Sequence, residues 1–576
     1  MSTTAATAPA SPPAVDQVNV QINGVWHKFP KGTRMIEACR QVGALVPHYC
    51  YHPKLTSPGN CRMCLVEMGM PPRPAPGTEP EKDEFGMPKI GWMPRPVIAC
   101  ANTVAEGQGI RTEGKLSEEC RKGVMELLLI NHPLDCPICD QAGECRLQEF
   151  SVEHGNGESR FREEKVKKPK NVDVGPRVRL DDERCIMCSR CIRFTAEIAD
   201  DPVLGFTERG SFTTLAVHPG KRLENNYSLN TVDICPVGAL TSNDFRFQMR
   251  VWFLKETKSL CTKCGRGCNT EISSRQKEIH RQTPRENNDV NSTWMCDQGR
   301  LDFHFVNSDY RLTQPLLKKE GKHFPVSWKL AIAEVTEALR SVKPSEIAVI
   351  ASARMTNEEL YLTHALIKTV GIEQFDVVPR TGGGDDYLRA DDMNPNSNGV
   401  RAIWGMEPGS KLPEILDAIT TGKVKVVLAL GENLLKLGIE KKALENLKYL
   451  VSSHVLANAT AEVSQVVLPA ATYAEKRGSM INVTGRLQRL GKAIDSPGEA
   501  RDDWEILRDI ILSYAGSNGI HTVDDVFKRM AGDVEIFSGL TLTRIGELGV
   551  QVMETGEKVP LLERERERRA KGIIVG

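Results

Sequence analysis

Four cysteines near the middle of the chain constrain its fold more than any other feature. Two residues separate Cys185 from Cys188 and two more separate Cys188 from Cys191, while Cys235 follows forty-four positions later and directly precedes Pro236. Thiolates at such spacing are typical of metal and iron–sulfur sites. This segment is therefore expected to fold around a bound inorganic group.

The positions that lack cysteine identify the pattern. Two-cluster bacterial ferredoxins repeat Cys-x2-Cys-x2-Cys-x3-Cys-Pro, and the fourth cysteine of each run ligates the cluster of the other run. Here Thr195 occupies the fourth position of the first run, and the second run has lost its first three cysteines, at Asn225, Ser228 and Thr231. Every ligand of one cluster is gone and every ligand of the other remains. We predict a [4Fe-4S] cluster on Cys185, Cys188, Cys191 and Cys235, with tetrahedral zinc as the alternative.

A second group of cysteines lies nearer the N-terminus, at Cys50, Cys61, Cys64 and Cys100. Its order is a stretched form of the plant-type [2Fe-2S] spacing, with ten residues instead of four in the first gap. Residues 71–96 carry eight prolines and no clear period, which predicts a surface loop inserted between the third and fourth ligands.

The residues before this group predict the start of a β-grasp ferredoxin domain. Apolar and polar residues alternate over 18–22, Asn23-Gly24 is a strong hairpin signal, and residues 25–29 can return as a second strand. A short helix is expected near 35–42, directly before the cysteine loop.

A third group contains His132, Cys136, Cys139 and Cys145, just after the apolar stretch 124–130. A lone histidine is more often a structural or surface residue than a ligand. Three closely spaced thiolates, however, would leave one iron of a [4Fe-4S] cluster without a ligand, and His132 lies one turn before Cys136. We predict His132 as the fourth ligand, partly from the family resemblance given below; an imidazole there should raise the reduction potential.

A fourth group, Cys261, Cys264, Cys268 and Cys296, predicts another [4Fe-4S] cluster, again with zinc as the alternative. Fifteen of the seventeen cysteines are thereby assigned. The remaining two, Cys39 and Cys120, are expected to be small buried hydrophobic residues.

Composition excludes several classes of partner. Lys plus Arg equals Asp plus Glu at 75 each, so no general attraction to nucleic acid or anionic lipid is expected. No apolar run approaches the roughly eighteen residues that span a bilayer. Residues 1–16 lack the features of a secretory signal and predict a disordered tail. So many free thiols fit a reducing compartment, and we expect a cytoplasmic protein that can dock on a membrane partner.

After Cys296 the pattern changes to α/β. Strands are predicted at 346–351, 424–430 and 454–457, and Thr356-x-x-Glu359 is a capping box that opens a helix ending at Gly371. Alternation of strands and helices indicates a largely parallel sheet covered on both faces.

Two further segments of this region receive structural interpretations. The run Gly382-Gly383-Gly384 lacks the lysine of a phosphate loop and precedes two aspartates, so it predicts an ordinary loop. Residues 561–576 include the run 563–569, which alternates in charge, and predict a solvated helix or tail.

The order of the four ligand groups resembles the large iron–sulfur subunit (the G or 75 kDa subunit) of bacterial respiratory complex I, the NADH:quinone oxidoreductase. Residues 466–488 are similar to the molybdopterin oxidoreductase domain that this family retains. Two departures are the long insertion before Cys100 and a tail that is short for a complete pterin-binding enzyme. An NAD-linked formate dehydrogenase or a hydrogenase iron–sulfur subunit is the alternative, but each would need later cysteines or more chain.

The resemblance implies a multidomain α+β and α/β protein with one [2Fe-2S] and three [4Fe-4S] clusters and no molybdopterin. The expected parts are a tail at 1–16, a [2Fe-2S] domain at 17–105, a His/Cys [4Fe-4S] domain at 106–150, a ferredoxin-type [4Fe-4S] domain at 175–250, a molybdopterin-oxidoreductase-type [4Fe-4S] domain at 254–310 and a truncated molybdopterin-oxidoreductase-like α/β domain at 311–576.

The resemblance also implies the role of the chain. Electrons from NADH enter at FMN on a partner subunit, pass the [2Fe-2S], Cys185 and His132 clusters, and leave through a ferredoxin-like subunit toward the quinone-site subunits. The Cys261 cluster lies off this route. No bond-making active site is expected on this chain, which would sit at the cytoplasmic face of the inner membrane through the complex.

Overall fold

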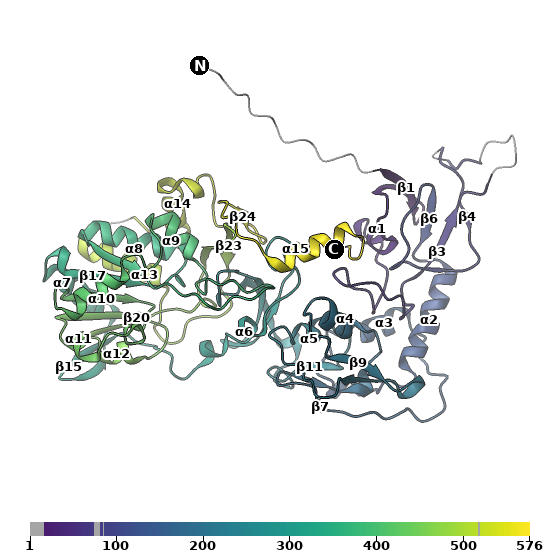
Figure 1. The fold of residues 1–576 in the computed structure, drawn as a ribbon, viewed down its shortest axis with the longest axis horizontal. Helices are drawn as coiled ribbons and strands as arrows, with labels where there is room; N and C mark the ends of the chain where they lie inside the picture. The colour runs from purple at the N-terminus through teal and green to yellow at the C-terminus, as the bar shows by residue number, and fades with distance from the viewer. Residues whose placement is uncertain (1–15, 74–80, 85, 517–518, 576) are drawn as a thin grey trace, which may run out of the picture. The chain divides into compact units, whose positions relative to one another are not determined.

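The fold is described from a computed structural model that covers residues 16–73, 81–84, 86–516 and 519–575 (Figure 1). Two compact units emerge: unit 1 contains the described residues through Arg246 together with those from Glu565 onward, and unit 2 contains Phe247–Arg564. Residues 1–15 of the expected tail lie outside the described residues.

Unit 1 begins with the predicted hairpin and a β-grasp sheet. Asn23 and Gly24 both have positive φ, at 49° and 89°, as a tight two-residue hairpin turn requires. The sheet order is β2-β1-β6-β3-β4, with β5 paired to β3, and β1 runs parallel to β6. Its elements are β1 (Gln17–Ile22), β2 (Val25–Pro30), α1 (Met35–Gln41), β3 (Leu65–Met70), β4 (Gly91–Trp92), β5 (Val97–Ile98) and β6 (Gln108–Arg111). Strand β4 lies within the proline-rich segment and pairs with β3.

The rest of unit 1 is built from short elements around loops that carry cysteines. Helices α2 and α3 contact each other, and two small antiparallel sheets follow them. The elements are α2 (Lys115–Leu129), η1 (Cys136–Ile138), α3 (Arg146–His154), β7 (Val172–Asp173), β8 (Val178–Leu180), η2 (Asp182–Arg184), α4 (Arg190–Glu197), β9 (Leu204–Thr207), η3 (Gly210–Phe212), β10 (Thr214–Val217), α5 (Asn230–Asp233) and β11 (Leu240–Ser242).

Unit 2 opens with a three-stranded antiparallel sheet in the order β12-β13-β14. Its early elements are η4 (Val251–Phe253), β12 (Lys255–Leu260), β13 (Asn269–Arg275), β14 (Glu278–Pro284), α6 (Asp297–Arg300) and η5 (His304–Asn307). The loop between β12 and β13 carries three cysteines, and a fourth directly precedes α6.

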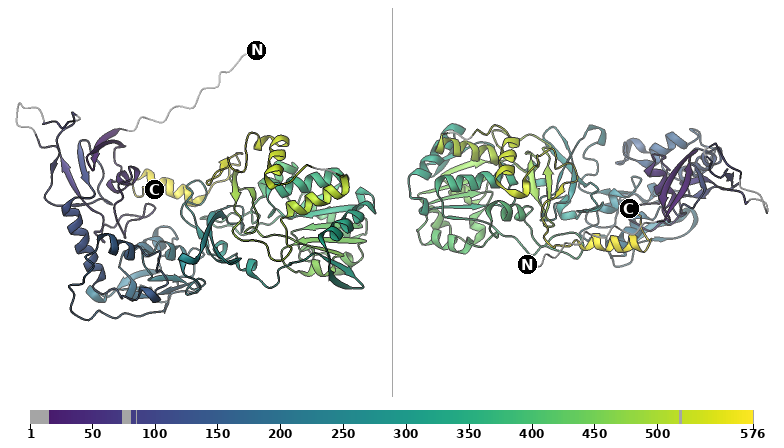
Figure 2. Two further views of the ribbon diagram at one scale, coloured as in Figure 1. Left: turned by 180° about the vertical axis from the view of Figure 1, so that it is seen from behind. Right: turned by 90° about the horizontal axis from the view of Figure 1, so that it is seen from above.

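The predicted α/β region of unit 2 is a seven-stranded sheet in the order β16-β15-β21-β20-β19-β17-β18. Strands β21 to β18 in this order are mutually parallel, and β17 and β19 are buried at every residue because helices cover both faces (Figure 2). The sheet and first helices are β15 (Leu316–Lys319), β16 (Lys322–Pro325), α7 (Trp328–Arg340), η6 (Pro344–Glu346), β17 (Ile347–Ala351), α8 (Asn357–Val370), β18 (Gln374–Val377), α9 (Ser397–Trp404), α10 (Leu412–Thr420) and β19 (Val426–Leu430).

The later elements of unit 2 complete this sheet and add a smaller one, in the order β22-β23-β24. They are η7 (Leu434–Leu437), α11 (Lys441–Glu445), β20 (Tyr449–His454), α12 (Ala459–Val463), β21 (Val466–Pro469), β22 (Gly478–Ile481), β23 (Arg486–Leu490), α13 (Asp503–Ala515), α14 (Val523–Asp533), η8 (Glu535–Phe537), β24 (Val550–Gln551) and α15 (Pro560–Ala570), which extends into unit 1.

Local signals located one helix of the tail accurately. Thr356 and Glu359 form the predicted reciprocal capping box at the start of α8, and Gly371 ends the helix in the left-handed conformation.

One strand position was wrong: the strand predicted at 454–457 is β20, Tyr449–His454. Its residues Ser452 and Ser453 are buried but polar, so the apolar pattern did not mark it.

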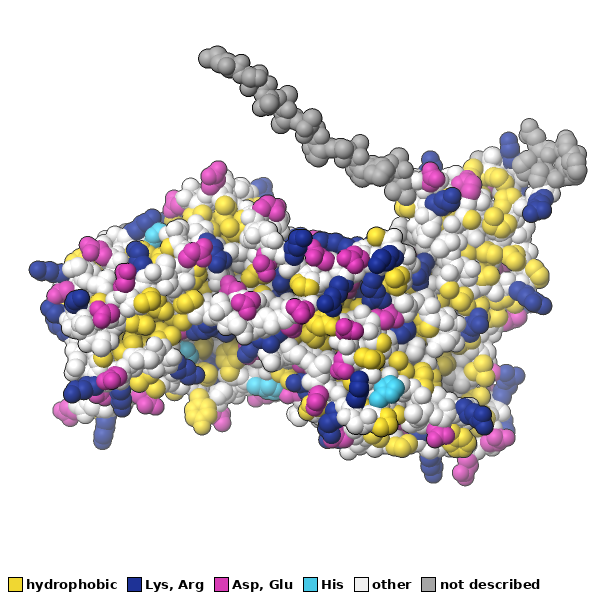
Figure 3. All heavy atoms as spheres, viewed as in Figure 1, with side chains coloured by type: hydrophobic (Ala, Val, Ile, Leu, Met, Phe, Trp, Pro, Cys, Tyr) yellow, Lys and Arg dark blue, Asp and Glu magenta, His cyan; other side chains and the backbone are white. Residues whose placement is uncertain are grey.

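The C-terminal segment forms the predicted helix, α15, but it is not simply solvated. Glu565 is 2% exposed and lies 3.6 Å from the Lys54 ammonium group, itself fully buried. Arg568 pairs with Glu197. Charge alternation could not reveal these partners, because both are distant in sequence. On the face drawn in Figure 3, basic and acidic side chains are interspersed, as the equal numbers of each in the sequence predict.

Candidate iron–sulfur ligand sets

The cysteines of each predicted ligand group interact with one another in the fold. Every one of the seventeen cysteines is a free thiol, so all fifteen assigned ones are available for ligation. Cys39 is buried as expected, whereas Cys120 is only partly buried on α2, which corrects its assignment as a core residue.

The Cys50 set comprises Cys50, Cys61, Cys64 and Cys100. The Cys50 backbone N–H donates to Cys61 Sγ at 3.5 Å, and the Cys50 and Cys64 thiols each interact with the Cys100 thiol. Hydrogen bonding to Cys50, and then burial, raises the pKa of the Cys61 thiol. Four thiols from loops beside α1, β3 and β5 are thus gathered at one point.

The Cys185 set comprises Cys185, Cys188, Cys191 and Cys235, and all four line one small cavity with apolar neighbours such as Ile186 and Leu240. Between the cysteines, Met187 and Ser189 have positive φ, at 54° and 62°. Such strain is uncommon for non-glycine residues and concentrates at functional sites. Burial raises the pKa of Cys235 to about 11, so a free thiolate there would be costly without a cation to neutralise it.

Three of the four positions of the lost cluster are core residues, and the fourth, Asn225, is partly exposed. Thr195, Ser228 and Thr231 are fully buried. The Thr195 hydroxyl donates to the Ile192 carbonyl, and the Thr231 hydroxyl donates to the Ser228 carbonyl. Backbone hydrogen bonds replace metal ligation at these positions.

The His132 set comprises His132, Cys136, Cys139 and Cys145, carried by the loop after α2, by η1 and by the residue before α3. His132 Nδ1 is buried and has no hydrogen-bond partner among the described residues. Burial lowers the pKa of the imidazole to about 4, which keeps it neutral. A neutral, buried, unpartnered ring nitrogen is the state in which histidine binds metals.

The Cys261 set comprises Cys261, Cys264, Cys268 and Cys296, each no more than 5% exposed. The Gly299 N–H donates to Cys296 Sγ at 3.3 Å, and the Cys261 N–H donates to the Cys268 carbonyl at 2.8 Å. Gly267 has φ of +62°, a conformation that lets the loop turn tightly between the thiols.

Across the described part of the chain, no three His, Cys, Asp or Glu side chains are arranged to hold a single metal ion. The donor chemistry nevertheless fits iron–sulfur clusters, since the thiols are buried or partly buried and lie in groups of three or four, and some of them accept backbone N–H groups. Within the described helices, none has the length and apolar character to cross a membrane.

Curated proteins similar to this chain are subunits of one respiratory enzyme. The G subunit of NADH-quinone oxidoreductase from Rickettsia conorii is 32% identical over 507 residues, which is 85% of this chain and 71% of that protein. The chain belongs to this family of NADH-quinone oxidoreductase subunits. The mitochondrial NADH-ubiquinone oxidoreductase 78 kDa subunit of Neurospora crassa is 39% identical over 360 residues, 62% of this chain and 45% of that one.

Family profiles match this NADH-quinone oxidoreductase subunit in the predicted order. They are a 2Fe-2S iron-sulfur cluster binding domain at 15–114, an NADH-ubiquinone oxidoreductase-G iron-sulfur binding region at 121–160, an NADH-quinone oxidoreductase subunit 3 ferredoxin-like domain at 175–241, an NDSU1/NuoG-like 4Fe-4S domain at 254–304 and a molybdopterin oxidoreductase profile at 311–386 and 392–512. The predicted mixture of ferredoxin-type and molybdopterin-oxidoreductase-like domains is confirmed.

Among solved structures, a chain of an NAD+-reducing [NiFe]-hydrogenase in the H2-reduced state matches 41% of this chain and 91% of its own length, at 24% identity and a TM-score of 0.33. That likeness is too weak to support the hydrogenase alternative.

Sequence reasoning missed the charged residues beside the ligands. Arg184 and Asp135 each directly precede a cysteine of a ligand set, and the buried Arg184 forms an ion pair with the partly exposed Asp135. Their positions next to Cys185 and Cys136 were the available signal, but forty-nine positions separate them in the chain.

Proposed function

We propose that this subunit of NADH:quinone oxidoreductase carries electrons from a partner's NADH and FMN site toward quinone, using one [2Fe-2S] and three [4Fe-4S] clusters. The observation that carries the proposal is the convergence of Cys235 with Cys185, Cys188 and Cys191 on one cavity. The Cys50 set would hold the [2Fe-2S] cluster, and the Cys185, His132 and Cys261 sets would each hold a [4Fe-4S] cluster.

Iron–sulfur clusters supply one-electron redox chemistry when bound. The residues of the chain supply their surroundings. Apolar side chains such as Ile186 and Leu240 exclude water from the Cys185 set, and the neutral His132 imidazole adds no charge to its own set. Both effects change the reduction potential of a bound cluster, because that potential depends on solvent exposure, on the charge of the ligands and on hydrogen bonds to sulfur.

The domain limits follow from these sets: a [2Fe-2S] domain at 17–105, then [4Fe-4S] domains at 106–150, 175–250 and 254–310, and the α/β domain at 311–576. The profile boundaries at 114, 121, 241 and 254 support similar divisions.

Partner subunits are expected to cover the surface around the His132 set. Leu127, Leu134, Ile138 and Val152 are between 64% and 85% exposed. A groove of about 470 Å³ lies beside α2 and is lined by Leu127, Leu134 and Phe161. Exposed apolar patches of this kind mark protein contacts. We assign this surface to a cluster-bearing subunit of the same complex, at the cytoplasmic face of the membrane.

We also propose that the α/β domain binds no molybdenum–pterin cofactor. A cavity of about 560 Å³ opens at the carboxyl ends of β17 and β19, lined by Arg354, Glu432 and Lys476 among others, and its described lining contains no cysteine. A thiolate to hold molybdenum is therefore not supplied at that cavity.

Elemental and sulfide analysis of the purified complex tests the proposal. Roughly fourteen irons should be attributable to this subunit if it holds one two-iron and three four-iron clusters, with no stoichiometric molybdenum, tungsten or pterin. A colourless protein containing zinc, or about one molybdenum per chain, would overturn the respective assignment.

A further inference from the structure

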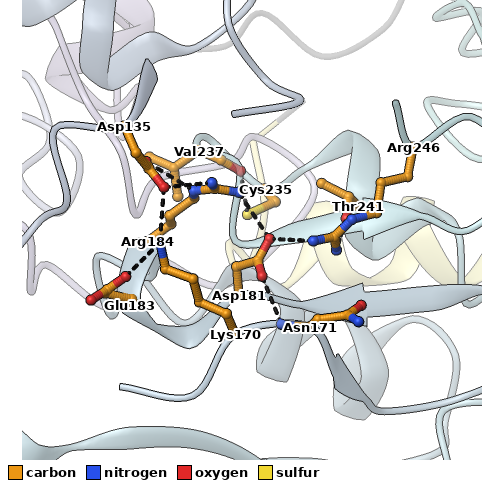
Figure 4. A network of polar contacts seen from close by, with 10 residues as sticks. All are labelled: Asp135, Lys170, Asn171, Asp181, Glu183, Arg184, Cys235, Val237, Thr241 and Arg246. Atoms are coloured by element: carbon orange, nitrogen blue, oxygen red, sulfur yellow. Dashed lines mark hydrogen bonds and ion pairs between the residues drawn. The ribbon is translucent and has the colours of Figure 1, made fainter. Parts of the chain in front are cut away.

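An ion pair between a buried arginine and a partly exposed aspartate joins the loops of the His132 and Cys185 sets (Figure 4). Arg184 directly precedes Cys185, and Asp135 directly precedes Cys136. Arg184 Nη2 donates to Asp135 Oδ2 at 2.7 Å, and Arg184 Nε donates to Asp135 Oδ1 at 3.2 Å. The Arg184 side chain is only 4% exposed. This two-point contact fixes both the distance and the orientation of the loops, as bidentate Arg–carboxylate pairs do.

Further charged groups surround this pair and complete its hydrogen bonding. Arg184 Nη1 donates to Asp181 Oδ2 at 2.8 Å, which also accepts from Arg246 Nη2 at 2.8 Å. On the other side, Lys170 Nζ lies 2.9 Å from Asp135 Oδ2 and 2.8 Å from Glu183. Arginines and lysine therefore alternate with carboxylates, and Arg184 is the member that contacts both Asp135 and Asp181.

The chain that leaves Cys235 also packs directly against the His132 set. The Pro236 carbonyl accepts a hydrogen bond from the Arg146 N–H at 3.2 Å and lies 3.9 Å from Cys145 Sγ. A Cβ placed on Gly238 would lie 2.4 Å from Cys139 Sγ and 3.6 Å from Arg184 Cδ. Contacts as short as 2.4 Å are essentially never seen for real Cβ atoms, so a larger residue at Gly238 would force Cys139 Sγ or the chain around Gly238 to shift.

We propose that Arg184 and Gly238 are positioning residues for electron transfer between the His132 and Cys185 sets. Gly238 has no side chain, so Cys139 can lie close to the segment that follows Cys235. The Arg184–Asp135 ion pair keeps the two loops at this distance. This inference rests on the proposed ligation by both sets.

Arg184 also acts through its charge. Reduction adds negative charge to a cluster, so a nearby fixed cation favours the reduced form, and burial protects the interaction from screening by salt. Arg184 and Cys139 are close neighbours, since a Cβ on Gly238 would lie near both side chains; burial raises the pKa of the Cys139 thiol, and the guanidinium opposes that rise. Arg184 therefore raises the potential of the cluster on the His132 set relative to a chain with a neutral residue there.

The test is a potentiometric EPR titration of the intact complex with Arg184→Gln, Arg184→Lys and Lys170→Gln. Arg184→Gln should lower the midpoint potential of the His132-set cluster, and Arg184→Lys should recover part of the shift because it keeps the charge but not the two-point contact. Lys170 contacts the same Asp135 but is 43% exposed, so Lys170→Gln should shift the potential less.

A second pair of variants tests the spacing without changing charge. Gly238→Ala should alter or remove the EPR signal of the His132-set cluster and leave the [2Fe-2S] signal intact. Gly123→Ala on α2, where a Cβ meets nothing within 4 Å, should leave both signals unchanged.

The outcomes separate this inference from the proposed function. An Arg184→Gln complex with full cluster content and an unchanged potential, or a Gly238→Ala complex with an unchanged His132-set signal, would overturn the inference alone. Absence of one or both [4Fe-4S] signals from the wild-type complex would instead overturn the proposed ligation. If Arg184→Gln fails to assemble, Arg184→Lys and Gly238→Ala still decide the question.

Discussion

The Cys185 and Cys261 sets each consist of four cysteine thiols, but their neighbours differ. The Cys185 set borders a second ligand set, through Arg184 and Gly238. The Cys261 loop is instead bonded to the α/β domain: the Gly265 N–H donates to the Asp392 carbonyl at 2.7 Å, and the Gly265 carbonyl accepts from the Val483 N–H at 2.8 Å.

Side chains reinforce this attachment of the Cys261 loop. Arg266 Nε donates to the Leu388 carbonyl at 2.8 Å, and Gln488 Nε2 donates to the Gly267 carbonyl at 2.9 Å. A cluster held there would stabilise the junction of two parts of unit 2. If the Cys185 set is a relay site and the Cys261 set a structural one, as we propose, the difference lies in the neighbours of each set and not in its four cysteines.

The largest effect is expected from removing a ligand of the relay site. Cys188→Ser should eliminate one [4Fe-4S] EPR signal and abolish NADH-to-quinone turnover, because electrons lose a required intermediate. NADH oxidation by an artificial acceptor at the flavin should survive in any complex that assembles. Full quinone turnover with the cluster demonstrably absent would contradict the relay assignment.

Removal of a cysteine from the Cys261 set should affect the stability of the complex and not its turnover. Cys296→Ala should lower the amount of assembled complex and its melting temperature, since a bound structural metal group contributes directly to folding free energy. Turnover per assembled complex should stay near that of the wild type. If the complex assembles fully and is inactive with quinone, the Cys261 set belongs to the electron route and the comparison fails.

A subtler change concerns the ligand type at the His132 set. His132→Cys should keep a four-iron cluster and lower its midpoint potential, because an added thiolate charge opposes reduction. Redox titration followed by EPR measures the shift. An unchanged spectrum and potential would show that His132 is not a ligand.

The smallest effect is expected within the α/β domain that anchors the Cys261 loop. Glu358 is fully buried and accepts from the Ser479 N–H at 2.9 Å and hydroxyl at 2.7 Å. Burial raises the pKa of this carboxyl to about 7. The folded protein therefore binds this proton more tightly than the unfolded chain, and that stabilisation is present below the unfolded pKa and is lost as pH rises through 7.

Glu358→Gln should remove this dependence. The difference in unfolding free energy between the Glu358→Gln variant and the wild type should shift in favour of the variant between pH 5 and pH 8, by an amount on the order of 3 kcal/mol or less. Melting temperatures of both proteins measured across this pH range would show the shift. Glu337→Gln, an exposed change on α7, is the control and should track the wild type. If the melting temperatures of Glu358→Gln and the wild type change with pH in the same way, the raised pKa assigned to Glu358 is wrong.

Much of the site could be predicted from sequence because ligand spacing is local. Cys185, Cys188 and Cys191 are separated by fixed short gaps, and the proline after Cys235 linked that distant residue to them. Local rules also located the Asn23-Gly24 turn and the capping box at Thr356. The strand predicted at 454–457 was misplaced because strand ends depend on pairing with neighbours.

The sequence by itself determined the family, the order of the domains and the residues proposed as cluster ligands, since each rests on residue type and spacing. Only the tertiary structure decided which residues connect one ligand set to another and to the rest of the fold. The Arg184–Asp135 pair, the fit of Gly238 against Cys139 and the burial of Glu565 against Lys54 join positions far apart in the chain. Such contacts depend on the packing of whole elements, and residue spacing carries no record of them.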